Sequence, residues 1–227
     1  MPLDPDRLSE RHRAFLALFR CHVALTPAAV RQLACPGDSI NAVMKVARRL
    51  SYRGWIEIHR LPAGGVFYLL SRRAAVALGL PRKKRRGLGH DAAVEHLGVL
   101  WLCLQVGIRK RSAADFQTAC PELCRRGLSS SRYAVGADDR LLWLIIDHGG
   151  RAARIAAKVA RAVAAREQLP SFGELIDSGG FGVVVAVPTD AKAAELEAAL
   201  AGGAVNPFVT VRVQVVPELV PLFLKGD

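Results

Sequence analysis

The chain has 227 residues, of which 51% are hydrophobic and 23% charged, as in an ordinary folded soluble protein. The first apolar run, at residues 15–19, is too short for a signal peptide, and residues 97–106 are too short to cross a bilayer, so we expect a cytoplasmic protein with no membrane partner. The net charge of +12 lies entirely in residues 1–90, which hold 17 Lys and Arg against 5 Asp and Glu, whereas residues 91–227 hold 15 of each. This asymmetry favours a polyanionic partner, and nucleic acid fits better than an anionic membrane because no long amphipathic basic helix with aromatic anchors is present.

The five cysteines are irregularly spaced and include no CxxC pair, and the histidines are not clustered, so the sequence does not complete a zinc site. We therefore expect no metal and no other cofactor, with reduced and mostly buried thiols. The set is Cys21, Cys35, Cys103, Cys120 and Cys124.

Three helical patterns open the chain. Residues 9–19 begin with polar side chains and continue into apolar ones clustered on one side, which predicts an amphipathic helix. A Thr-Pro pair opens residues 26–33, and a cap followed by proline at the first helical position predicts a second, short helix. Ser39 or Asp38 can cap a third helix, which we expect to run to about Tyr52.

A pair of strands follows the third helix. Residues 55–60 and 66–70 have strand character and are joined by a glycine-containing turn, which predicts a β-hairpin before a short helix at residues 72–80. Three helices and then a hairpin is the order of a winged helix-turn-helix. We therefore expect such a domain over residues 1–80, and we expect it to bind double-stranded DNA.

The third helix and the hairpin, or wing, supply the expected DNA contacts. In winged helices the third helix enters the major groove, while the wing reaches the backbone or the minor groove. Arg can pair with guanine, Asn with adenine, and Lys with phosphate or guanine, and which of these residues read bases stays open. The expected contact residues are Asn41, Lys45, Arg48, Arg49, Arg53 and Arg60.

Residues 81–90 contain five consecutive basic residues between a proline and a glycine, which predicts an exposed basic linker. The linker is either a solubilising tether or, in the interpretation we prefer, a source of phosphate contacts that add affinity without sequence selectivity. Its basic residues are Arg82, Lys83, Lys84, Arg85 and Arg86.

Residues 91–227 alternate helical and strand patterns, which predicts an α/β domain with a partly parallel sheet covered by helices. The most apolar strand should be central in the sheet, and the first helix, apolar nearly all round, should be buried. The fold class that we expect for the whole chain is therefore α+β. The expected strands are residues 132–135, 140–147, 183–187 and 208–216, and the expected helices are residues 91–106, 151–168 and 190–200.

Four short motifs, spread over most of the chain, resemble the replication-relaxation family. They are residues 48–56, 67–71, 89–91 and 144–150, the last of which reads Leu-Ile-Ile-Asp-His-Gly-Gly. The family includes proteins of plasmids and conjugative elements, some of them similar to mobilisation C-type relaxases. The resemblance implies a winged helix joined to a domain similar to the PD-(D/E)xK nuclease fold.

The nuclease signature of that family is incomplete here. A metal-dependent nuclease of this fold needs an acid on one strand and further acids, or an acid and a lysine, on the next strand, to hold a divalent ion and orient water. Residues 133–134 read Tyr-Ala where the family carries Pro-Asp, and Ile145 stands at the first acidic position of the next strand. Asp147 matches the following position, and Asp138 or Asp139 could substitute from the turn before the strand. The resemblance therefore implies a degenerate, non-catalytic domain.

Together these patterns lead to one main hypothesis and two alternatives. The main hypothesis is a non-enzymatic, double-stranded DNA-binding protein that acts in the mobilisation or replication of a plasmid or conjugative element, or in its control. Its α/β domain would supply a homodimer contact or a contact with a relaxosome or replication protein. The alternatives are a metal-dependent nickase that uses Asp147 with Asp138 or Asp139, and a transcriptional repressor.

Overall fold

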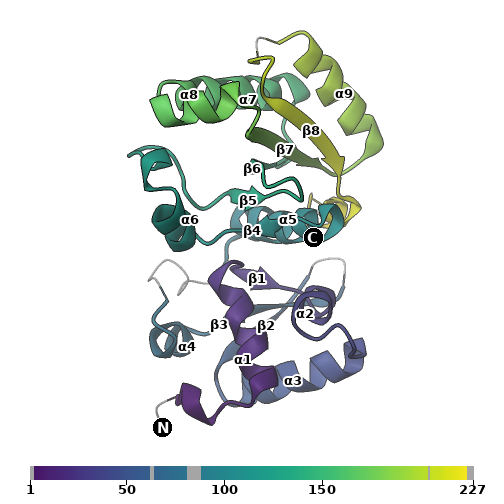
Figure 1. The fold of residues 1–227 in the computed structure, drawn as a ribbon. Coiled ribbons are helices and arrows are strands. Elements are labelled where there is room, and N and C mark those ends of the chain that lie inside the picture. The colour runs from purple at the N-terminus through teal and green to yellow at the C-terminus, as the bar shows by residue number, and fades with distance from the viewer. Residues whose placement is uncertain (1–2, 62–63, 81–87, 204, 224–227) are drawn as a thin grey trace. The chain divides into compact units, whose positions relative to one another are not determined.

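The computed structural model describes residues 3–61, 64–80, 88–203 and 205–223 (Figure 1). The chain divides into two compact units, one ending at Leu100 and the other running from Trp101 to Phe223. This division falls inside helix α5 (His90–Val106), later in the chain than the linker expected at residues 81–90. Helices and sheet are present in both units, so the predicted α+β class is confirmed.

The first unit contains three helices, a three-stranded antiparallel sheet, a short fourth helix and the first part of α5. Its sheet has the order β1-β3-β2, with Ala24 opposite Leu69 and Ile58 opposite Tyr68. The predicted helices and hairpin all form, although the end of the first predicted helix is a separate 3-10 helix over residues 18–20. The sequence patterns missed the 3-10 helix at residues 5–7 and the two-residue strand β1. The elements are η1 (Pro5–Arg7), α1 (Glu10–Ala17), η2 (Leu18–Arg20), β1 (Ala24–Leu25), α2 (Pro27–Ala34), α3 (Ile40–Tyr52), β2 (Ile56–Arg60), β3 (Val66–Leu70) and α4 (Arg72–Ala77).

Each of the helices α1 to α4 begins after a hydroxyl cap. Ser9, Thr26, Ser39 and Ser71 each accept a hydrogen bond from the backbone N–H three residues later, at 3.1–3.3 Å. These bonds satisfy N–H groups that have no partner inside the helix, and such caps typically contribute about 1 kcal/mol each. Ser39 is therefore the cap of α3, and Asp38 instead forms an ion pair with Arg11 of α1.

The core of the first unit is built on the apolar face of α3 and on a group of aromatic rings. Val43, Val46, Ala47 and Leu50 of α3 are buried, as the helical period predicts. The rings of Phe15 and Tyr68 lie 5.6 Å apart, and both residues are 1% exposed. Because this face of α3 is buried in the core, the opposite face of the helix is exposed to solvent.

The second unit contains one five-stranded sheet and the helices that connect its strands. The sequence patterns predicted four of the five strands and two of the connecting helices, and they missed the elements between residues 109 and 123, α8, and the short helices between residues 217 and 223. Apart from the end of α5, the elements are β4 (Arg109–Lys110), α6 (Ala113–Ala119), η4 (Pro121–Leu123), β5 (Tyr133–Val135), β6 (Leu141–Ile146), α7 (Ala152–Glu167), α8 (Pro170–Asp177), β7 (Phe181–Val187), α9 (Asp190–Ala201), β8 (Thr210–Val215), η5 (Pro217–Leu219) and α10 (Val220–Phe223).

The sheet of the second unit is partly parallel, in the order β4-β5-β6-β7-β8. The first two pairs are antiparallel, whereas β6 pairs in parallel with β7, and β7 in parallel with β8. Parallel neighbours need a crossover, which α7 with α8 provides before β7 and α9 provides before β8. The apolar strand β6 is central, as predicted, and every residue of β7 is buried.

A buried arginine lies in the core of the second unit. The side chain of Arg166 on α7 donates from Nε to the Tyr133 hydroxyl at 2.9 Å and from Nη1 to the Ala162 carbonyl at 2.7 Å. Its guanidinium carbon lies 4.2 Å from the centroid of the Trp143 ring. Burial lowers the pKa of Arg166, and the Tyr133 hydroxyl opposes that effect. A cation held among aromatic rings therefore takes the place of an ion pair in this core.

Helix α5 has a buried body, as predicted for a helix that is apolar nearly all round; its residues Leu97, Leu100 and Leu102 are 0% exposed. Within the part of the chain that the structure describes, no helix combines the length and apolarity needed to span a membrane.

All five cysteines are free, but only Cys103 is buried, so the expectation of mostly buried thiols is wrong. Cys124 is exposed because it follows the surface turn η4 and lies in no apolar helix face or strand.

Candidate nucleic-acid interface

The outward face of α3 carries the residues that the sequence singled out. Asn41, Lys45, Arg48 and Arg49 are exposed, and Arg53, also exposed, is the C-cap residue. Folding brings these five predicted contact residues onto one helix, because the apolar positions between them are held in the core.

Helical spacing sorts these residues into two rows. Asn41, Lys45, Arg48 and Tyr52 are separated by four, three and four positions, so they follow one line along the helix, which we call the α3 stripe. The stripe is about 16 Å long at 1.5 Å per residue. Arg49 and Arg53, four positions apart, form a second row beside it.

Tyr52 is the functional candidate that the sequence analysis missed. It is 95% exposed, which is the largest value among the exposed large hydrophobic residues that the structure describes. An aromatic side chain this exposed contributes little to the core. The signal was present in the sequence, because Tyr52 lies four positions after Arg48 and therefore on the same face of the helix.

The cations of α3 have no acidic neighbours within the helix, which contains no Asp or Glu. No ion pair joins Lys45, Arg48 or Arg49 to another residue in the described ranges. These charges also act on a neighbouring helix. Burial lowers the pKa of His12 on α1, and the positive charges of Arg53 and Arg49 lower it further. Burial also raises the pKa of Tyr68 to about 12, against an opposing effect from Arg48.

The hairpin places Arg60 at the end of β2, where it is exposed and lies opposite Val66. His59, its neighbour, stacks on Phe67 with ring centroids 5.2 Å apart and contacts the Glu57 carboxylate at 3.3 Å. The turn itself includes Gly64, whose φ of +89° suits a residue without a Cβ.

The basic run of the linker falls outside the described residues, so the structure adds nothing to its expected role. These residues are Arg82, Lys83, Lys84, Arg85 and Arg86. The interface is therefore built here from α3 and the hairpin alone.

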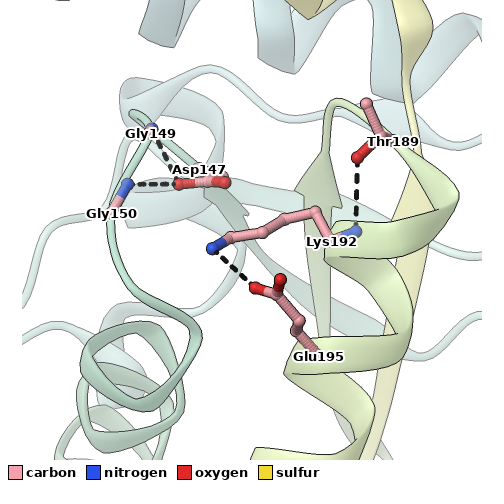
Figure 2. A network of polar contacts seen from close by, with 6 residues as sticks. All are labelled: Asp147, Gly149, Gly150, Thr189, Lys192 and Glu195. Atoms are coloured by element: carbon pink, nitrogen blue, oxygen red, sulfur yellow. Dashed lines mark hydrogen bonds and ion pairs between the residues drawn. The ribbon is translucent and has the colours of Figure 1, made fainter.

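In the second unit, Asp147 lies directly after β6 and is 1% exposed. Its Oδ1 accepts hydrogen bonds from the backbone N–H groups of Gly149 and Gly150, at 2.8 and 2.9 Å (Figure 2). Its Oδ2 is also buried and has no hydrogen-bond partner among the residues that the structure describes. One oxygen of Asp147 therefore stabilises the turn that leads to α7.

The turn residues Asp138 and Asp139 do not join Asp147. They precede β6, whereas Asp147 follows it, and a six-residue strand separates the two ends by about 20 Å. Asp138 instead pairs with Arg140 at 3.0 Å. The prediction that either turn residue could complete a metal site with Asp147 is therefore wrong, because the strand that separates them in sequence also separates them in space.

On α9, which follows β7, the carboxylate of Glu195 forms an ion pair with a lysine of the same helix. Lys192 of α9 contacts Glu195 at 3.2 Å, and its backbone N–H donates to the cap residue Thr189 at 3.2 Å (Figure 2). Across the described ranges, no group of three or more His, Cys, Asp and Glu side chains converges as metal ligands would.

Comparison of the chain with known proteins finds no matching family model, no matching curated protein and no matching solved structure.

Proposed function

We propose that the chain is a double-stranded DNA-binding protein whose first unit is a winged helix-turn-helix that places α3 in the major groove. One observation carries the proposal: the exposed face of α3 presents cations without acidic partners, in the part of the chain that holds all of its excess positive charge. A solvated helix face usually mixes both charge signs, and α3 does not.

The order of elements supports this proposal. The sequence α1-β1-α2-α3-β2-β3, with β3 between the other two strands, is what we expect of a helix-turn-helix followed by a wing. In this arrangement α2 and α3 are the helix pair, and the hairpin of β2 and β3 is the wing that carries Arg60.

The two rows on α3 suit two kinds of contact. Asn41 and Arg48 on the α3 stripe can each form paired hydrogen bonds with a base edge in the major groove. Arg49 and Arg53 in the second row suit phosphates, which fix the register of the protein on the duplex but carry no sequence information. Lys45 can serve either purpose.

We further propose that the second unit is a non-catalytic domain similar to the PD-(D/E)xK nuclease fold. Its sheet has three antiparallel strands followed by a parallel strand after a helix, which fits that fold, while Ile145 and the isolated Asp147 leave its metal site incomplete. On this proposal, and on the resemblance to the replication-relaxation family, the protein acts in plasmid or conjugative DNA mobilisation or replication, or in its control. The second unit then forms a homodimer or binds a relaxosome or replication protein.

Footprinting with the full chain, on DNA of the genetic element that encodes it, tests this proposal. We expect one or a few protected sites that overlap a transfer or replication origin, and their protection should disappear in the variant Asn41→Ala/Arg48→Ala. Protection of a promoter alone would instead indicate a transcriptional repressor. Absence of protection anywhere, with a folded protein, would overturn the proposal.

A further inference from the structure

Tyr52 adds an apolar side chain to the α3 stripe, whose other three members are polar or charged. It is the last residue of α3 and is 95% exposed. Among the described residues, its ring stacks on no other ring and its hydroxyl has no hydrogen-bond partner. Single exposed apolar residues are common on protein surfaces, and what distinguishes Tyr52 is its place on the stripe. The stripe therefore presents one large apolar surface at its end.

The backbone that carries Tyr52 is fixed on both sides. Leu50 is 0% exposed and Trp55 is 3% exposed, and the Trp55 N–H donates to the Leu50 carbonyl at 2.9 Å. Gly54, with a φ of +79°, ends the helix and donates to the Ser51 carbonyl at 2.8 Å. A tyrosine has only two side-chain torsions, so ordering its ring in a contact costs little conformational entropy. The end of α3 therefore holds the ring out as a nearly rigid contact group.

The base edges in the major groove offer one apolar partner for such a ring. The groups that distinguish the base pairs there are hydrogen-bond donors, acceptors and the C5-methyl group of thymine. Contact between the ring and this methyl group removes apolar surface of both from water. Phosphate contacts do not require the ring, because Arg49 and Arg53 in the neighbouring row supply charge for them. The chemistry of Tyr52 therefore favours a thymine edge.

We propose that Tyr52 recognises thymine, with its ring packed against the C5-methyl group in the major groove, and that it is a specificity-determining residue beside Asn41 and Arg48. This inference rests on the proposed function of α3. Tyr52 follows Arg48 by four positions, which is about 6 Å along the helix, and successive base pairs are about 3.4 Å apart. The thymine should therefore lie within about three base pairs of a guanine that Arg48 reads.

Uracil substitution in the footprinted duplex tests the contact, because uracil lacks only the C5-methyl group of thymine and still pairs with adenine. Each thymine of the site is replaced in turn, and fluorescence anisotropy at one fixed salt concentration gives the Kd of the full chain. At one position or more, uracil should weaken wild-type binding about fourfold, the factor that corresponds to burial of one methyl group. A wild-type Kd that no uracil substitution changes would overturn the proposal.

Three variants assign the methyl contact to Tyr52. Tyr52→Ala should bind the thymine duplex more weakly than the wild type does, and it should bind the uracil duplex as tightly as the thymine duplex. Its stability to urea should equal that of the wild type, because the side chain is exposed. Tyr52→Phe keeps the ring and should keep the preference for thymine over uracil. The matched control Phe208→Ala removes a 61% exposed ring from the second unit and should behave as the wild type does. A preference for thymine that persists in Tyr52→Ala, or that disappears in Tyr52→Phe, would contradict the proposal.

Arg48→Ala, measured on the same duplexes and on random DNA, separates failure of this inference from failure of the proposed function. If α3 reads DNA without a thymine contact from Tyr52, Arg48→Ala still loses binding selectively on the preferred site, while Tyr52→Ala leaves the effect of uracil unchanged. If α3 does not read DNA, Arg48→Ala and Tyr52→Ala both lose no more binding on the preferred site than on random DNA. Both results overturn the thymine contact, and only the second also overturns base reading by α3.

Discussion

Replacing Arg48 with alanine separates base reading from simple charge attraction. Arg48 lies in the middle of the α3 stripe, is exposed and has no ion pair with a described residue. Its loss should therefore change the free energy of unfolding by less than about 0.5 kcal/mol. If Arg48 forms paired hydrogen bonds with guanine, the variant should lose about 1–3 kcal/mol on the preferred site, which is roughly 5- to 150-fold in Kd.

Fluorescence anisotropy at one fixed salt concentration measures this effect, with the footprinted site and a random duplex of equal length. Arg48→Ala should weaken binding to the preferred site much more than binding to the random duplex. The matched control is Arg72→Ala, which removes the same charge from an exposed position on α4 and should affect both duplexes slightly and equally. Equal loss on both duplexes for Arg48→Ala, and likewise for Asn41→Ala and Arg49→Ala, would refute the assignment of α3 as the reading helix.

Three further predictions concern stability and catalysis. Arg166→Ala should destabilise the second unit by about 3 kcal/mol in urea unfolding, because it leaves a cavity among packed rings and an unpartnered Tyr133 hydroxyl. The control Arg125→Ala, at an exposed position, should change the free energy of unfolding by less than about 0.5 kcal/mol. Similar small changes in both variants would contradict the structural role of Arg166. Purified protein should not nick supercoiled DNA with Mg²⁺ or Mn²⁺, and Asp147→Ala should keep duplex binding while destabilising the second unit; metal-dependent nicking that this substitution abolishes would establish an enzyme. The pKa of His12 is lowered in the folded state, so the unfolded chain binds the proton more tightly. The wild type should therefore lose more stability than His12→Gln as the pH falls through 6.5. Parallel pH profiles of stability for the two proteins would contradict this.

Local signals in the sequence predicted much of the first unit. The cap expected at Ser39 or Asp38 and the helical period of α3 placed its ends and its exposed face correctly, because both depend on residues within a few positions of one another. Strand β1 was missed because its two residues, Ala24 and Leu25, owe their strand conformation to pairing with distant residues of β3. Sequence-local patterns carry little information about such pairing.

In the second unit, some errors had a signal that could have corrected them. Ser112 caps α6 and Pro170 opens α8, so both missed helices had recognisable starts. The separation of Asp138 from Asp147 also followed from the predicted strand between them, since an extended strand holds its two ends far apart.

The salt dependence of duplex binding by the full chain tests the central claim most directly. If Arg49 and Arg53 contact phosphates, the slope of log K against log salt for Arg49→Ala/Arg53→Ala should be shallower than that of the wild type by about 2, at about 0.9 per contact. The control Arg125→Ala/Arg126→Ala removes the same charge from the second unit and should keep the wild-type slope. An unchanged slope in the α3 variant, or an equal decrease in both variants, would contradict DNA binding through α3.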